Sequence, residues 1–148
     1  MKPKDEIKKV YFAYGSNLCR KQMKTRCPNH QVIGIGVLKG YRWIISARGY
    51  ANIVKSKPDE VYGIVYEISE SDEHSLDHCE GVHNGKYRKE MIMIEVNGQS
   101  RECLVYIDSI KTEGNAEEKY IKRINQGICN SNLPSEYVNR YIRKFIPA

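Results

Sequence analysis

The chain has 148 residues, of which 41% are hydrophobic and 28% are charged, and it carries a formal net charge of +6. This length and composition are typical of one globular domain and exclude a disordered chain, so we expect a single domain over residues 1–148. No apolar run is long enough to span a membrane, and the charged start lacks a signal peptide. Five cysteines, an odd number, suit free thiols. Together these features predict a cytoplasmic protein without a membrane partner.

The positive charge is spread along the chain, with acidic residues between the lysines and arginines. Tyrosines near Arg140, Arg143 and Lys144 raise the alternative of an RNA-binding module, but no recognised RNA motif accompanies them. A solvated basic surface, which would also attract an anionic small molecule, is the favoured interpretation. We therefore expect no nucleic-acid partner.

The first half of the chain predicts three strands and a short helix. Residues 9–14 form a strand that ends at the Gly-Ser-Asn corner of residues 15–17, and a helix over about 19–25 stops before Pro28. Residues 31–46 are β-branched and punctuated by glycines, which indicates a bent or bulged strand. Residues 60–68 alternate between two faces and form the clearest strand.

The second half predicts a helix, a hairpin and two closing helices. Ser69 or Ser71 can cap a helix that opens with acids and ends at Gly81 in a left-handed conformation. Residues 87–107 form a hairpin through Asn97-Gly98. Apolar stripes then indicate two amphipathic helices, the last beginning near Pro134. The pattern predicts an α+β fold whose mostly antiparallel strands form a curved sheet or barrel.

Two places could carry chemistry. The N–H groups of the corner that follows Tyr14 could hold a carboxylate or a developing oxyanion, and Gly15 allows close approach, although an ordinary turn explains the same residues. Glu80 ends a predicted helix, where the helix dipole and partial burial would raise its pKa towards that of a base near neutral pH. A solvated helix-end glutamate is the simpler alternative.

Histidines and cysteines do not form a recognised metal site. Those that are close together in the chain are Cys27 and His30, and His74, His78, Cys79 and His83. The i, i+4 spacing of His74 and His78 suits zinc, but Ser75 stands where the HExxH motif needs glutamate. Cys79 and its neighbour His78 point apart on a helix and cannot pair as nucleophile and base. We predict neither a metal nor a cofactor.

Four segments, taken in order and spacing, resemble the γ-glutamylcyclotransferase family. They are "YFAYGSNL" from residue 11, "EVYGIVYEI" from residue 60, "SLDHCEGVHNGKY" from residue 75 and "EEKYIKRINQGICNSNLPSEYV" from residue 117. The resemblance extends from about Val10 to Val138. It implies a small β-barrel, mixed but mostly antiparallel, flanked by helices and with one cavity at an end.

The resemblance also implies an activity that needs no metal or cofactor. Enzymes of the family cyclise a γ-glutamyl group to 5-oxoproline and release the amine that the group had acylated, a reaction that contributes to glutathione metabolism. By motif position, Glu80 would be the catalytic acid/base and Tyr120 would contact substrate. The loop that binds substrate oxygens would comprise Tyr14, Gly15, Ser16, Asn17 and Leu18.

Some assignments stay open at this point. Tyr87 and Tyr106 are further candidates for the pocket lining, or they form an edge of the barrel core. The segment "LDHCEG" has histidine and cysteine where relatives often carry more polar or acidic residues, so γ-glutamyl amino acids, γ-glutamyl amines and glutathione all remain candidate substrates. The alternative function is a non-catalytic small-molecule-binding module of the same fold. A homodimer is neither indicated nor excluded.

Overall fold

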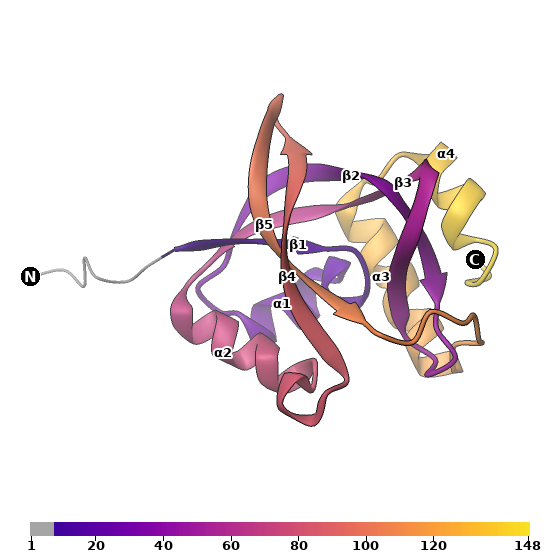
Figure 1. Ribbon diagram of the computed structural model, residues 1–148, viewed down its shortest axis with the longest axis horizontal. Coiled ribbons are helices and arrows are strands. Elements are labelled where there is room, and N and C mark those ends of the chain that lie inside the picture. The colour runs from indigo at the N-terminus through magenta and orange to yellow at the C-terminus, as the bar shows by residue number, and fades with distance from the viewer. Residues whose placement is uncertain (1–7) are drawn as a thin grey trace, which may run out of the picture.

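The computed structural model describes residues 8–148 and contains a closed barrel of five strands (Figure 1). The strands are β1 (Lys9–Ala13), β2 (Gln31–Ile45), β3 (Ala51–Ile68), β4 (Tyr87–Val96) and β5 (Gln99–Asp108). Around the barrel their order is β1-β3-β2-β4-β5. β1 runs parallel to β5 and the other neighbours are antiparallel. The predicted α+β fold with a mixed, mostly antiparallel barrel is confirmed.

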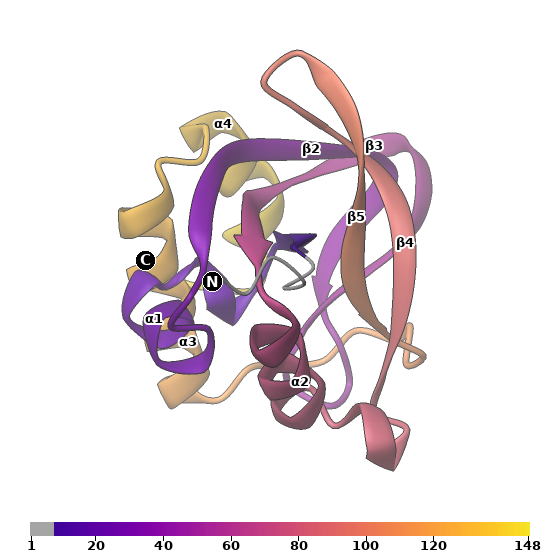
Figure 2. The ribbon, with the colours of Figure 1, turned by 90° about the vertical axis from the view of Figure 1, so that its left-hand side faces the viewer.

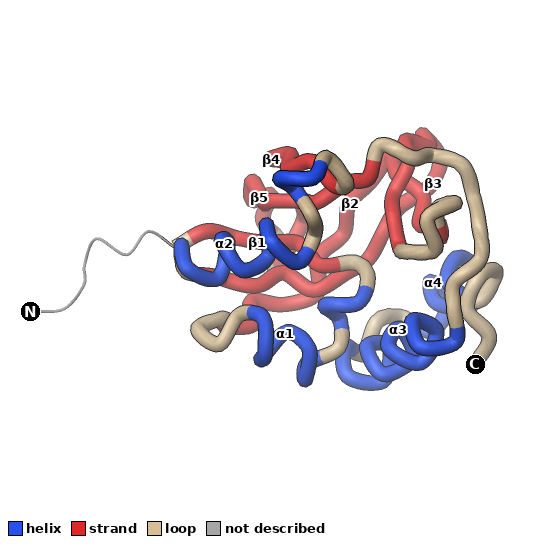
Figure 3. The backbone as a smooth tube through the Cα atoms, turned by 90° about the horizontal axis from the view of Figure 1, so that it is seen from below, coloured by secondary structure: helices blue, strands red, loops and turns tan. Residues whose placement is uncertain are grey.

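Short helices flank the barrel. They are the 3₁₀ turns η1 (Ser16–Leu18) and η2 (Val82–Asn84), the α-helices α1 (Arg20–Arg26), α2 (Glu70–Cys79), α3 (Glu118–Ser131) and α4 (Ser135–Tyr137), and the π turn η3 (Val138–Ile142). In the view of Figure 1, α1 and α2 lie below the barrel and α4 lies to its right. Figure 3, in which the molecule is seen from below, shows α2 in front of the strands and α1 and α3 beside them, along the lower edge of the picture. Within residues 8–148, no helix has the length and apolar character of a membrane span.

β2 and β3 form a long hairpin that curves around much of the barrel (Figure 2). β3 begins at Ala51, well before the predicted start at residue 60, because residues 51–55 pair with residues 41–45 of β2. The polar residues 56–59 lie at a shift in this pairing. The register shifts between Val32 and Gly34 and between Lys39 and Tyr41. These bulges bend β2, as its glycine-punctuated sequence predicts.

The barrel interior is filled by large side chains. Phe12, Trp43 and Tyr66 are almost fully buried in one hydrophobic cluster that also receives the apolar faces of the helices. Gly63 permits the close approach of the end of β1 to β3, since a Cβ at this position would lie 2.2 Å from the carbonyl oxygen of Ala13. The tip of the β4–β5 hairpin projects beyond the barrel in Figures 1 and 2. Positive φ angles at Asn97 (51°) and Gly98 (77°) confirm the predicted turn.

The helix ends lie where the local signals in the sequence predict them. The one difference is a π turn that follows α4. Ser69 caps α2, and its side chain and that of Asp72 form a capping box. Gly81 has a left-handed conformation with a φ of 67°, as predicted. Pro134, predicted at the start of the last helix, lies just before Ser135, and the helix then widens into a π turn from Val138.

We expect Ser69→Ala to lower the free energy of unfolding by about 1 kcal/mol, because the N-cap oxygen that accepts from the Asp72 amide is lost. Urea denaturation followed by circular dichroism measures the change. Ser75→Ala in the interior of the same helix is the matched control. Since alanine has the higher helix propensity, this control should be neutral or slightly stabilising, and equal losses in both variants would contradict the capping role.

Candidate active site

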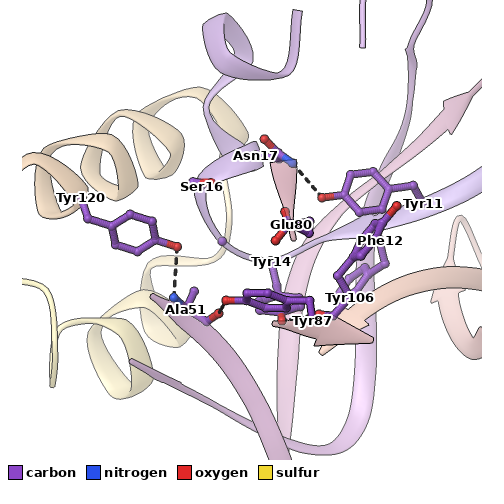
Figure 4. Close-up of a pocket in the computed structure, with 11 residues that line it drawn as sticks. Tyr11, Phe12, Tyr14, Ser16, Asn17, Ala51, Glu80, Tyr87, Tyr106 and Tyr120 are labelled. Atoms are coloured by element: carbon purple, nitrogen blue, oxygen red, sulfur yellow. Dashed lines mark hydrogen bonds between the residues drawn. The ribbon is translucent and has the colours of Figure 1, made fainter. Parts of the chain in front are cut away.

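A cavity of about 40 Å³ lies between the end of β1, the end of α2 and the start of α3. Its lining consists of Tyr11, Phe12, Tyr14, Gly15, Ser16, Asn17, Ala51, Glu80, Tyr87, Tyr106 and Tyr120. Figure 4 shows Glu80 near the centre, with Ser16 and Asn17 on one side and Tyr87 and Tyr106 on the other. The cavity thus brings together the corner after β1 and the glutamate that ends α2, which are more than sixty positions apart in the sequence.

Leu18 is the one residue of the predicted site that does not line this cavity. Its N–H donates to the Gly15 carbonyl oxygen at 3.0 Å, so it is not free to bind a ligand. Its side chain is buried against α3, where a Cβ on Gly127 would approach the Leu18 Cβ to 2.7 Å. Leu18 therefore links the loop to the helix, and it lies outside the cavity that the other predicted site residues line.

The corner after β1 has backbone N–H groups that are available to bind a ligand. Within residues 8–148, the N–H groups of Gly15, Ser16 and Asn17 donate to no backbone or side-chain acceptor. The position of Gly15 has no room for a side chain, because a Cβ there would lie 2.9 Å from the Ala51 Cβ. Three consecutive unpaired donors beside a cavity can bind a carboxylate or an oxyanion.

Asn17 is predicted to bind substrate, but its side chain holds the loop in place. Its amide nitrogen donates to the Tyr11 hydroxyl at 2.9 Å, and its amide oxygen accepts from Gln22 at 2.9 Å and from Arg26 at 3.2 Å. The Asn17 carbonyl oxygen accepts from the Tyr66 hydroxyl at 2.8 Å. These bonds satisfy the buried amide and leave the Asn17 N–H as its contribution to the cavity.

Tyrosine side chains form most of the remaining wall. Tyr14 donates to the Tyr106 carbonyl oxygen at 2.6 Å, and Tyr87 donates to the Ala51 carbonyl oxygen at 2.7 Å. The Ala51 N–H donates to the Tyr120 hydroxyl at 3.1 Å (Figure 4). Burial raises the pKa of Tyr14, Tyr87 and Tyr120 above the usual value, so these phenols stay neutral. They present fixed dipoles to the cavity.

Glu80 is the carboxylate of the cavity. It caps the C-terminal end of α2, and its N–H donates to the Leu76 carbonyl oxygen at 2.8 Å. Its side chain is only 18% exposed and accepts no hydrogen bond from residues 8–148, and the Arg26 guanidinium lies 4.0 Å away. Burial raises the pKa of Glu80 to about 7, while Arg26 opposes this rise. Burial is therefore the main cause of the raised pKa.

Three lining residues and one supporting residue are absent from the sequence predictions. Tyr11 and Phe12 lie in the quoted "YFAYGSNL" segment, whose alternation could have indicated that they share the pocket region. Ala51 gives no signal, since its place follows from the unforeseen start of β3. Asp77 accepts from the Tyr106 hydroxyl at 2.7 Å, and its spacing of three from Glu80 along the chain was the available clue.

None of the cysteines and histidines of residues 8–148 lines this small cavity. His74, His78 and Cys79 are exposed, and the His30 ring nitrogen Nδ1 lies 2.6 Å from the Cys27 carbonyl oxygen. In the described part of the chain, no three histidine, cysteine, aspartate or glutamate residues are arranged to hold a metal ion. All five cysteines are described, and each is a free thiol.

The small cavity continues into a wider one of about 580 Å³, and Ser16, Glu80, Tyr87 and Tyr120 line both. A space of this size accommodates a small-molecule ligand. The barrel therefore carries a pocket that contains both a carboxyl group with a raised pKa and unpaired main-chain donors. This combination defines a small β-barrel protein with a site for a small-molecule ligand.

Comparisons with known proteins give the family. The sequence pattern of the AIG2-like family matches residues 60–141. The chain is 30% identical to human gamma-glutamylcyclotransferase, covering 90% of this chain and 77% of that protein, and 32% identical to the mouse protein, covering 86% and 74%. A solved structure of a gamma-glutamyl cyclotransferase superposes with a TM-score of 0.83 at 27% identity, covering 90% of this chain and 86% of that one. The chain belongs to the γ-glutamylcyclotransferase family of AIG2-like proteins and is an enzyme of the cyclotransferase class.

Proposed function

We propose that this enzyme cyclises the γ-glutamyl group of a γ-glutamyl amino acid or γ-glutamyl amine to 5-oxoproline and releases the free amine. One observation carries the proposal. Glu80, a carboxyl group with a pKa of about 7 and no hydrogen-bond donor from residues 8–148, lines the same cavity as the unpaired N–H groups of residues 15–17. Glu80 is the general acid/base, and the loop binds substrate oxygens.

The reaction begins with a proton transfer. The α-amine of the substrate is an ammonium group at neutral pH and cannot attack until the Glu80 carboxylate removes a proton. The amine nitrogen then attacks the γ-carbonyl carbon of the same molecule, forming the C–N bond of a five-membered ring. Attack within one molecule is favoured once the pocket holds the bent conformer.

The developing negative charge is stabilised by the loop. The γ-carbonyl oxygen becomes an oxyanion, and the N–H groups of Gly15, Ser16 and Asn17 donate to it. Breakdown of this intermediate breaks the original amide bond, and Glu80 delivers a proton to the leaving nitrogen. Two protons pass from the attacking to the leaving nitrogen over the whole reaction. Losing one such main-chain donor typically costs about 3 kcal/mol in barrier.

A substrate panel tests this function. The protein is incubated with γ-glutamyl-alanine and with γ-glutamyl-butylamide, and 5-oxoproline and the released amine are quantified by mass spectrometry. We expect both products in equal amounts. Thermal stabilisation by 5-oxoproline without turnover of any γ-glutamyl compound would instead support a non-catalytic binding module.

We expect Gly15→Ala to lower kcat/KM by roughly tenfold to a hundredfold, because the new methyl group would displace the loop and misplace its donors. The clash partner is the Ala51 Cβ at 2.9 Å, whereas the Tyr120 hydroxyl at 3.4 Å is at an ordinary contact distance. Adding Ala51→Gly should therefore restore most of the activity of the Gly15→Ala variant. Steady-state kinetics on both variants and on Ala51→Gly alone measure this, and full activity of Gly15→Ala would contradict the donor role of the loop.

The cytoplasm is the compartment that we propose for this reaction. All five cysteines are free thiols, and Cys79 and Cys129 are exposed. Exposed thiols persist where the cell keeps cysteines reduced. Fractionation of cells that express the tagged protein tests the assignment.

A further inference from the structure

We infer that the wider cavity, which we call the vestibule, receives the part of the substrate that leaves. This inference rests on the proposed function, in which Glu80 delivers a proton to the leaving nitrogen. Glu80, Ser16, Tyr87 and Tyr120 line both the inner cavity and the vestibule, so the leaving nitrogen lies where the two meet. The rest of the leaving amine then extends into the vestibule, whose volume of about 580 Å³ is large enough for a dipeptide.

The vestibule has an excess of positive charge. Its cationic side chains are Arg26, Arg48, Lys86, Lys119 and Arg123. Its carboxyl groups are Glu80, which at neutral pH is only partly ionised, and Glu117. The cations come from α1, the β2–β3 turn, the segment before β4 and α3, so four separate parts of the chain supply them.

One of the five cations is neutralised by the fold. Arg48 donates to both oxygens of Asp108, at 2.9 Å and 3.3 Å, and Asp108 is fully buried. This pair is structural, since loss of the arginine would leave a buried carboxylate without its partner. Arg48 therefore adds little net charge to the vestibule.

Arg26 lies 4.0 Å from Glu80, and the other three cations keep most of their charge available. Arg123 donates to the Gln22 side-chain oxygen, a neutral partner. Lys86 and Lys119 are exposed, and neither has a carboxylate of residues 8–148 within 4.0 Å. Lys86 is held at the wall, because its N–H donates to the Gly81 carbonyl oxygen at 3.1 Å and its stem packs against Gly81. The stem of Lys86 is thus kept near the end of α2.

We propose that the vestibule selects leaving amines that carry two or more carboxylates, such as a dicarboxylic amino acid or a short acidic peptide. A concave wall with unneutralised cations attracts carboxylates more strongly than an open surface does, because less water screens the interaction. A γ-glutamyl amine without a carboxylate leaves these cations without a partner. The vestibule therefore favours acidic γ-glutamyl compounds through kcat/KM.

The test compares substrates that differ in charge but hardly in shape. The wild-type protein is assayed with γ-glutamyl-aspartate and γ-glutamyl-asparagine, with γ-glutamyl-butylamide as the neutral reference. At low ionic strength we expect kcat/KM for the aspartate compound to exceed that for the asparagine compound by about fivefold to tenfold. Added salt should reduce this ratio towards one.

Substitutions of the vestibule lysines then test whether these residues cause the preference for the aspartate compound. In Lys86→Gln/Lys119→Gln the aspartate-to-asparagine ratio should fall towards one, whereas Lys39→Gln on the exposed face of β2 should leave it unchanged. Because the ratio compares two substrates on one protein, partial loss of active enzyme does not alter it. A ratio near one in the wild type, or an unchanged ratio in the double variant, would overturn this inference while leaving the proposed function intact. No turnover of any γ-glutamyl compound would overturn both.

Discussion

Glu80→Gln is expected to reduce kcat for 5-oxoproline formation by about 10²- to 10⁴-fold, which is the usual contribution of a positioned acid/base. Glutamine keeps the size of the side chain and its place at the end of α2 but can neither remove the ammonium proton nor protonate the leaving nitrogen. Steady-state kinetics with γ-glutamyl-alanine measure the loss. Affinity for 5-oxoproline, measured by calorimetry, should change far less, because the loop donors of residues 15–17 remain.

Glu95→Gln is the matched control, since this exposed glutamate lies on β4 at the tip of the hairpin, away from the cavity. It should retain full activity. A Glu80→Gln protein as active as this control would remove the basis of the proposed mechanism, and another group would have to carry the proton.

The same Glu80→Gln substitution is expected to stabilise the fold above neutral pH. Burial raises the pKa of Glu80 from an ordinary 4.5 to about 7, so the folded protein holds this proton more tightly than the unfolded chain does. The contribution of Glu80 to the free energy of unfolding therefore falls as the pH rises from about 4.5 to about 7, by about 3 kcal/mol in all. Glutamine does not titrate, so the variant does not lose this part of the free energy of unfolding.

Urea denaturation of both proteins at pH 4.5 and pH 8 measures the effect. The variant should gain stability relative to the wild type between the two pH values, and the other titrating groups cancel in this comparison. A constant difference in the free energy of unfolding at both pH values would show that the Glu80 carboxyl is not perturbed by burial.

These two expected results have a common physical origin. A carboxyl group held away from water without a hydrogen-bond donor destabilises the fold when it ionises. That same environment gives it a proton affinity suited to exchange with an amine near neutral pH. The large barrel core, with Phe12, Trp43 and Tyr66 almost fully buried, offsets this local cost. The environment that makes Glu80 suitable for proton transfer therefore lowers the stability of the fold at this position.

Local features of this protein were determined by the sequence alone. The cap at Ser69, the left-handed Gly81 and the Asn97-Gly98 turn depend on the backbone preferences of a few neighbouring residues. The place of Glu80 at the end of a helix is also a local feature, but the rise of its pKa depends on burial by distant parts of the chain. Such rules act within one or two turns of the chain, so they can be applied without knowledge of the fold.

Only the tertiary structure decided what surrounds these features. Ala51 approaches Gly15 and Tyr120 because β3 starts earlier than its polar sequence indicates, and pairing with β2 sets that start. Leu18 turned out to support the loop because α3 packs over it. The cations of the vestibule gather from four segments for the same reason. Closure of the barrel selects neighbours by burial and strand pairing across distant parts of the chain, and no short-range preference encodes that choice.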